Sequence, residues 1–324
     1  MRQEKIDSLA TAQGLKRALQ EVLIDNFELK LRVSDIAHYN RCQRSFSFSK
    51  LGFSPQVEGK RRTALLREPE NFDKGTLIHH LYALHQTHGL DLEDIDKTRE
   101  VVLGHAMEML GVEDPLMFES SPTWVKCFND VTRSAYGYPK WASQDSVFAF
   151  AKKIFAEQTL STSWHQSAER GVLEVTLEGH PDLLILEQDD TWTVPDHKSS
   201  AGTPQTLVAN NPQLLAYAWL VGLNKGPVRQ VAHIHTKING RTRAAKPPYF
   251  IQTRHYLPND SFMVAVEESM RTTVCSMGSE VGATHSITEM CNRTCRYKNL
   301  CSLYDTDRGR ALQVIGDTYV QADG

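Results

Sequence analysis

Two aspartates and a lysine are spaced so that they could form one metal site. The residues between Asp182 and Asp196 are first apolar, then polar and turn-forming, then β-forming, and they predict a β-hairpin centred near Asp189. Each aspartate lies seven residues from that centre. A symmetric register would therefore place the two carboxylates opposite each other, roughly 5 Å apart. Lys198 would leave the same face of the strand as Asp196, because side chains alternate along a strand.

Two carboxylates so close together repel each other unless a cation neutralises them. A hard divalent cation such as Mg²⁺ or Mn²⁺ is held by a few carboxylates together with oxygens of a bound phosphate. Such an ion polarises the phosphate and acidifies a water, and a nearby lysine can orient that water or stabilise the transition state. The pattern therefore predicts phosphodiester hydrolysis. The alternative is an ordinary exposed hairpin with acidic residues near its turn.

The following segment predicts a helix that could reach the same site. Asn211 is a good N-cap, Pro212 suits the first helical position, and Gly222 suits the end of the helix. Gln213 and Tyr217 are four residues apart, so they share one face of this helix. The pair could contact a phosphate or the lysine, although this spacing is common on amphipathic helices.

Together these motifs resemble those of PD-(D/E)XK nucleases of the RecB and AddB exonuclease family, to which CRISPR-associated RecB-like exonucleases and exonuclease V are similar. The resemblance covers residues 30–305 and includes Gly75, which begins a G-x-x-x-H motif. It implies that the metal ligands are His79, Asp182, Asp196 and the backbone carbonyl of His197. It also implies that Lys198 is catalytic and that Gln213 and Tyr217 contact the substrate or support the site. His80 is the alternative to His79, and Glu157 is a further acidic candidate.

The resemblance implies an α/β fold with a PD-(D/E)XK, or restriction-endonuclease-like, core around a central mixed sheet. We expect a helical insertion and an iron–sulfur staple that joins the N- and C-terminal parts. The expected segments are an N-terminal helical and basic part (1–68), a core helix with the ligand histidine (69–90), the helical insertion (91–168), the nuclease core (169–280), a cysteine cluster (281–305) and a tail (306–324).

Hydrophobic patterns refine this outline. Residues 1–30 are expected to form an amphipathic helix, and residues 172–177, 228–238 and 249–256 to form strands. Five aromatic residues of the insertion are expected in the core: Trp124, Trp141, Phe148, Phe150 and Trp164.

A second metal site is indicated near the C-terminus. Cys291, Cys295 and Cys301 fall within eleven residues of a chain without secretory features, which favours metal binding over disulfides. Cys42 is the natural fourth ligand, and Cys127 and Cys275 are the alternatives. Zinc and an iron–sulfur cluster both suit such a set, and spacing alone does not separate them.

The resemblance favours a [4Fe–4S] cluster, with zinc as the second choice. In the family, one cysteine lies upstream of the nuclease core and three lie downstream, as Cys42 and the C-terminal three do here. This chain departs from the usual pattern in having Gln43 instead of proline after the first cysteine. It also has three residues, where two are common, between Cys291 and Cys295.

The charge distribution is uneven although the net charge is only −3. Residues 41–67 hold seven Lys or Arg and one acid, residues 225–254 hold seven and no acid, and residues 89–121 hold nine acids. This uneven distribution of charge suits a basic DNA-binding groove with an acidic outer face. The alternative is that these charged residues are scattered over the surface and solvated. The candidate DNA contacts are Arg41, Arg44, Arg241, Arg243 and Lys246.

The sequence thus predicts a metal-dependent nuclease, most simply an exonuclease on single-stranded DNA or DNA ends in recombination, repair or phage DNA metabolism. No signal peptide and no apolar run near 18 residues is present, so we expect a cytoplasmic protein of a bacterium or a phage-infected cell, without a membrane span. No G-x-x-x-x-G-K-[ST] motif occurs, so a helicase would be a separate partner. The alternatives are a structure-selective or nicking endonuclease and a non-catalytic DNA-binding module with a vestigial site.

Overall fold

The computed structural model describes residues 24–25, 28–50, 53–55, 68–69, 71–144, 146–168, 171–200, 211–237, 250–258, 260–279, 295, 297, 301 and 319–321. The chain divides into two compact units. The first unit takes residues 1–60, 161–179 and 264–324, and the second takes residues 61–160 and 180–263. All the residues predicted to form the nuclease site lie in the second unit.

The described residues of the second unit form a mixed sheet with the strand order β10-β9-β8-β7-β4. The strands are β4 (Ala151–Ala156), β7 (Leu183–Glu187), β8 (Trp192–Ser200), β9 (Val228–Lys237) and β10 (Phe250–Tyr256). Strands β8 and β9 are parallel, and the other neighbouring pairs are antiparallel. The predicted α/β class with a central mixed sheet is confirmed.

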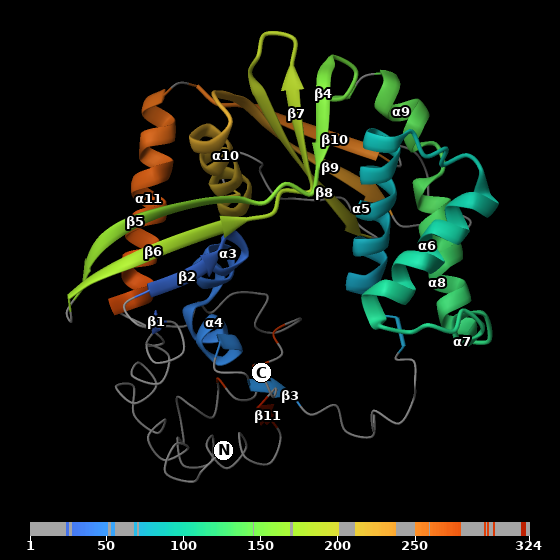
Figure 1. The fold of residues 1–324 in the computed structure, drawn as a ribbon, viewed down its shortest axis with the longest axis horizontal. Helices are drawn as coiled ribbons and strands as arrows, with labels where there is room; N and C mark the ends of the chain where they lie inside the picture. The colour runs from blue at the N-terminus through green and yellow to red at the C-terminus, as the bar shows by residue number, and fades with distance from the viewer. Residues whose placement is uncertain are drawn as a thin grey trace. The chain divides into compact units, whose positions relative to one another are not determined.

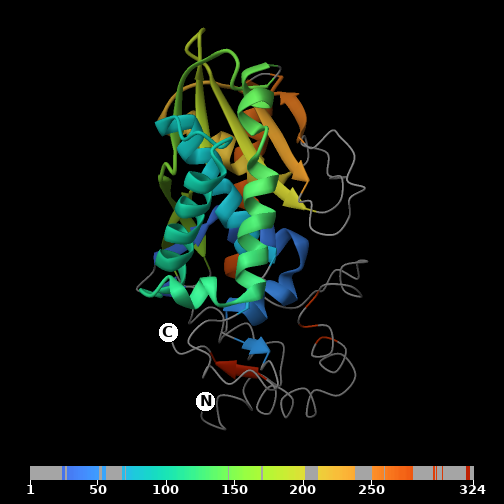
Figure 2. The same cartoon turned by 90° about the vertical axis from the view of Figure 1, so that its right-hand side faces the viewer.

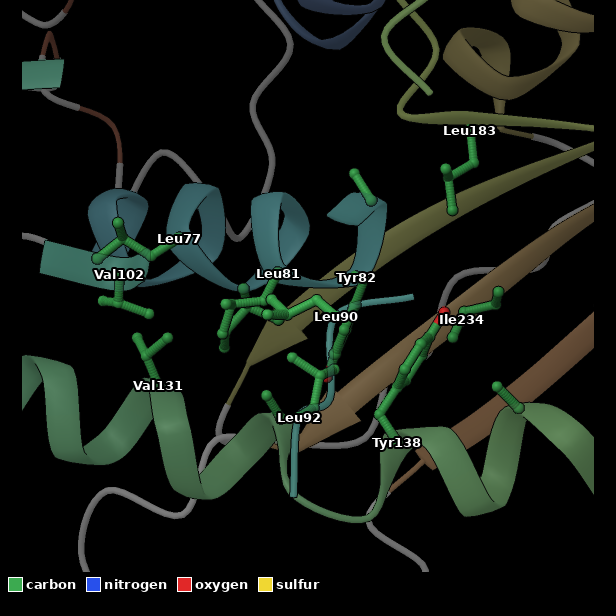
Figure 3. Packing of buried hydrophobic residues seen from close by; sticks show 14 of the residues in the cluster. Leu77, Leu81, Tyr82, Leu90, Leu92, Val102, Val131, Tyr138, Leu183 and Ile234 are labelled. Carbon is green, nitrogen blue, oxygen red and sulfur yellow. The ribbon is translucent and has the colours of Figure 1, made fainter. Parts of the chain in front are cut away.

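One face of this sheet is covered by a layer of helices (Figure 2). They are α5 (Asn71–His88), α6 (Ile95–Leu110), α7 (Leu116–Glu119), α8 (Pro122–Ala135) and α9 (Tyr138–Gln144). Figure 3 shows Leu81 and Tyr82 of α5 packed between Val131 of α8 and Ile234 of β9. All four are fully buried, and each large apolar side chain buried in this way stabilises the fold by about 1.5–3 kcal/mol.

The opposite side of strands β8 and β9 carries α10 (Pro212–Asn224) (Figure 1). The side chain of Asn211 accepts hydrogen bonds from the backbone amides of Gln213 and Leu214, as the sequence predicts for an N-cap. The expected end at Gly222 is wrong, because the helix continues to Asn224 and its C-cap is Lys225. The amide of Lys225 donates to the carbonyl of Val221 and the side chain of Asn224 donates to that of Leu220, both over 2.8 Å, so the last turn is hydrogen-bonded past the glycine.

The first unit has its own sheet of described strands, in the order β1-β2-β6-β5. Its strands are β1 (Ile24–Asp25), β2 (Glu28–Arg32), β5 (Leu160–Ala168) and β6 (Gly171–Gly179). The expected helix over residues 1–30 is wrong at its C-terminal end, because β2 pairs in parallel with β6. Leu29 and Leu31 are buried and alternate with exposed residues, which is a strand pattern. Residues 1–23 lie outside the described part of the chain.

The remaining described elements are α3 (Val33–Arg41), α4 (Gln43–Lys50), β3 (Phe53–Pro55), α11 (Asp260–Ser279) and β11 (Tyr319–Gln321). Strand β11 pairs with β3, so a segment near the C-terminus joins one near the N-terminus.

The expected aromatic core is confirmed for Trp124, Phe148 and Trp164, each of which is at most 9% exposed. Phe150 is 68% exposed, so its placement in the core is wrong. It lies in the turn before β4, where the chain leaves the helical layer. None of the described helices combines the length and the apolar character that crossing a membrane requires.

Candidate active site

The hairpin formed by β7 and β8 has the register that the sequence predicts. Ile185 pairs with Thr193 and Leu186 pairs with Trp192. Continued three residues beyond these two pairs, the same register would place Asp182, which directly precedes β7, opposite Asp196. The two aspartates are thus brought to the same end of the hairpin from opposite strands.

Lys198 and Asp196 form an ion pair on β8. The Nζ atom of Lys198 lies 2.9 Å from Oδ1 of Asp196. The Asp196 side chain is 9% exposed, whereas that of Lys198 is 43% exposed. The lysine thus connects a buried carboxylate to solvent, where a substrate phosphate could approach.

Helix α5 brings His79 to Asp182. The Nδ1 atom of His79 lies 3.3 Å from Oδ2 of Asp182. Gly75 lies one turn earlier, where an added Cβ would come within 3.1 Å of the Ser199 hydroxyl of β8. The glycine therefore permits the close approach of helix and strand that positions His79. Burial alone would raise the pKa of the Asp182 carboxyl, but the hydrogen bond and charge of His79 lower it below its ordinary value.

The side chain of His197 points to the opposite face of the sheet and is fully buried. Its Nε2 atom lies 3.1 Å from the Tyr138 hydroxyl, and its ring centroid is 5.0 Å from that of Tyr82. Burial first, and then the charge of His79, lowers the pKa of His197 to about 3. This ring is therefore part of the helical layer, and only the backbone of His197 remains available to a metal.

Helix α10 contributes Gln213 and Tyr217. The Nε2 atom of Gln213 donates to the Tyr217 hydroxyl over 3.2 Å. Burial raises the pKa of Tyr217, and the negative charges of Asp182 and Asp196 raise it further. These electrostatic effects indicate that the pair lies on the side of the two carboxylates.

Two contacts of the site were missed from sequence. Asp196 of β8 and His233 of β9 are partners in the parallel register, and Nε2 of His233 lies 3.2 Å from Oδ2 of Asp196. The same nitrogen lies 3.0 Å from Nδ2 of Asn211, which the sequence suggested only as a helix cap. The sequence predicts a strand over residues 228–238, but it does not reveal which residue of β8 lies opposite His233.

Two other candidates lie beside these residues. The backbone amide of Glu157 donates to the carbonyl of Asp182 over 3.2 Å. His80, the alternative to His79, instead stacks on His105, with ring centroids 3.8 Å apart. The His79 ring is therefore the one in contact with Asp182.

Two buried polar atoms of the candidate metal ligands are unsatisfied. Among the described residues, no three His, Cys, Asp or Glu side chains are grouped tightly enough to hold an ion as they stand. However, Nε2 of His79 and Oδ2 of Asp196 are both buried and make no hydrogen bond. Buried polar atoms are rarely left unsatisfied. A carboxylate oxygen is an ordinary ligand of Mg²⁺ or Mn²⁺, and a neutral imidazole nitrogen is a common metal ligand in proteins.

Of the predicted cluster cysteines, Cys42, Cys295 and Cys301 are described, and Cys291 lies outside the described residues. Cys42 ends α3, and its sulfur accepts from the amide of Ser45. The alternative ligand Cys127 is 1% exposed within the apolar cluster of the second unit.

The predicted DNA contacts differ in their accessibility. Arg41 is exposed, whereas Arg44 is only 5% exposed. Arg44 is therefore not available to a phosphate, because it packs inside the first unit. Arg241, Arg243 and Lys246 lie outside the described part of the chain.

Comparison with known proteins identifies the family. The sequence model of the PD-(D/E)XK nuclease superfamily matches residues 30–302. No curated protein matches the chain. Among solved structures, a crystal structure of SSO0001 matches with a TM-score of 0.36 and 13% identity, over 89% of this chain and 93% of that chain.

Proposed function

This chain belongs to the PD-(D/E)XK nuclease superfamily, and we propose that it is a metal-dependent deoxyribonuclease that degrades single-stranded DNA or DNA ends as an exonuclease. The membership indicates a metal-dependent nuclease. The observation that carries the assignment of the site is the β7–β8 register, which supports a shared role for Asp182 and Asp196. The Lys198–Asp196 contact adds a cation at the same place.

In this proposal His79, Asp182, Asp196 and the backbone carbonyl of His197 hold a Mg²⁺ or Mn²⁺ ion. When bound, such an ion polarises the scissile phosphate and makes a water acidic enough to attack it. The unsatisfied atoms of His79 and Asp196 support this ligand set. His79 also orients Asp182 through their 3.3 Å contact.

The other residues act on the substrate. Lys198 is held by Asp196 and is half exposed, so its ammonium can donate to the attacking water or to the charge that develops on the phosphate. The Tyr217 hydroxyl accepts from Gln213, which leaves its own proton free to donate to a phosphate oxygen.

The test is cleavage of end-labelled linear and covalently closed circular single-stranded DNA, with Mn²⁺ or Mg²⁺ and protein purified without oxygen. We expect loss of the linear substrate only. Lys198→Ala should reduce the rate by about 10²-fold or more, the usual effect of removing a transition-state donor. Lys140→Ala, at an exposed position of α9, is the matched control and should cleave as the wild type does.

Each other outcome points to an alternative. Cutting of the circle would replace the exonuclease with an endonuclease that uses the same site. Absence of metal-dependent cleavage of either DNA, with the protein folded, would favour a non-catalytic DNA-binding module.

We further propose that Cys42, Cys291, Cys295 and Cys301 hold a [4Fe–4S] cluster that staples the N- and C-terminal segments. A contact within the first unit supports this. Phe48 of α4, the helix that begins directly after Cys42, packs against Tyr297, which lies between Cys295 and Cys301. Their ring centroids are 5.6 Å apart, and both side chains are fully buried.

The metal and sulfide content of anaerobically purified protein tests this cluster. We expect iron and acid-labile sulfide in equal amounts, both lost in Cys301→Ser and retained in Cys275→Ser. Zinc without sulfide would assign a zinc site instead. Full retention of iron in Cys301→Ser would refute the ligand set.

A further inference from the structure

His233 and Asp196 are neighbours across the parallel pair β8–β9, and both are buried. The two residues are 5% and 7% exposed. Nε2 of His233 and Oδ2 of Asp196 are 3.2 Å apart, yet Oδ2 makes no hydrogen bond. The histidine is therefore close enough to donate to this carboxylate but is not aligned to do so.

Asn211 determines which ring nitrogen of His233 carries the proton. Oδ1 of Asn211 accepts from the amides of Gln213 and Leu214, over 3.0 and 3.2 Å. These two bonds fix the orientation of the side-chain amide, so Nδ2 is the atom that faces His233 at 3.0 Å. An amide nitrogen can only donate. In a neutral His233 ring, Nε2 must then accept, and the ring proton is on Nδ1.

The position of the ring proton decides whether His233 can donate a hydrogen bond to Asp196. A His233 ring with its proton on Nε2 could turn to donate to Oδ2 of Asp196, and that bond would compete with a cation for the same oxygen. With Nε2 engaged by Asn211, the histidine offers Asp196 no proton. Oδ1 of Asp196 already accepts from Lys198, so Oδ2 is the oxygen that remains for an ion.

We propose that Asn211 and His233 form a positioning pair that keeps Oδ2 of Asp196 free of hydrogen-bond donors and thus available to the metal ion. This inference rests on the proposed function, because it assigns a role at the same site. It also links the start of α10, which carries Gln213 and Tyr217, to the strand that carries Asp196.

The first test is the tautomer of His233 in the metal-free protein, observed in long-range ¹H–¹⁵N spectra of ¹⁵N-histidine-labelled samples. We expect the proton on Nδ1 in the wild type. Asn211→Ser keeps a good N-cap but removes the amide donor, and should move the proton to Nε2. A wild-type ring protonated on Nε2 would overturn the proposal without any measurement of activity.

The second test is Mn²⁺ affinity, measured by calorimetry on folded protein. Asn211→Ser should weaken binding by roughly tenfold or more, the usual effect of changing a partner of a metal ligand. Asn211→Ser combined with His233→Phe should restore wild-type affinity, because phenylalanine cannot donate to Asp196. Asn224→Ser removes an amide donor at the other end of α10 and should bind Mn²⁺ as the wild type does.

The remaining outcomes separate other roles. If the double variant binds more weakly than Asn211→Ser, His233 supports the metal directly and the proposal fails. If His233→Phe alone loses affinity as severely as Asp196→Asn, His233 is a ligand and the proposal also fails. A wild-type protein that neither binds Mn²⁺ nor cleaves DNA would refute the proposed function. The tautomer measurement on His233 would still test the contact between Asn211 and His233 independently.

Discussion

Gly75 of α5 and Ser199 of β8 approach so closely that a methyl group on the glycine would lie 3.1 Å from the serine hydroxyl. The same helix carries His79 one turn later, and the same strand carries Lys198 immediately before Ser199. The helix that carries His79 and the strand that carries Lys198 are therefore held at a separation that a glycine permits.

Gly75→Ala should reduce cleavage more than it reduces stability. Alanine normally stabilises a helix by about 0.5–1 kcal/mol relative to glycine, but here the added methyl would press on the Ser199 hydroxyl at 3.1 Å, and we expect the resulting small adjustment to shift His79. We expect an unchanged or slightly lower melting temperature with a reduced turnover rate. Adding Ser199→Ala removes the hydroxyl and should restore both helix stability and activity. Full activity of Gly75→Ala alone would show that the close approach does not position His79.

Asp196→Asn should stabilise the metal-free protein against unfolding. It should also abolish the gain in stability that Mn²⁺ gives to the wild type. The substitution removes a buried charge with an unsatisfied oxygen, and the asparagine keeps a side-chain oxygen that can accept from Lys198. Wild-type protein should gain about 2.7 kcal/mol of stability at an Mn²⁺ concentration 100 times the dissociation constant. Thermal melts with chelator and with Mn²⁺ measure both effects. An equal Mn²⁺ shift in the variant would exclude Asp196 as a ligand.

Tyr217→Phe should slow cleavage by about tenfold, which corresponds to the loss of one hydrogen bond to a charged group. Its Mn²⁺ affinity should not change, because the hydroxyl is not proposed as a ligand. Gln213→Ala should add little further loss in the Tyr217→Phe background, since the two side chains act through one hydrogen bond. Additive losses in the double variant would mean that the two residues act separately.

Cys127 should make the protein less stable at alkaline pH. Burial raises the pKa of the Cys127 thiol from 9.0 to about 12. Between these values the unfolded chain loses its proton while the folded chain keeps it, so stability falls as the pH rises above 9.0. The slope from this group approaches about 1.4 kcal/mol per pH unit. Denaturant unfolding of wild type and Cys127→Ala across this range isolates the contribution, and equal slopes would contradict it.

Local sequence patterns were enough to predict the β7–β8 hairpin, its register and the start of α10. The turn-forming residues around Asp189 predicted the hairpin, and the period of two along a strand predicted that Asp182 and Asp196 would be opposed, as the observed register implies. The N-cap at Asn211 and the helix that follows it were predicted for the same reason, because capping and turn chemistry depend on a few adjacent residues.

Only the tertiary structure decided which distant residues meet the hairpin. The contact of His79 with Asp182 depends on α5 packing over β8, and that of His233 with Asp196 depends on a parallel register between strands joined through a helix. No local pattern specifies such a register. Local patterns also failed where α10 continues beyond Gly222 and where Phe150 lies exposed in a turn. The sequence by itself determined the hairpin and the helix start that carry the candidate residues, and the fold determined which distant residues contact them.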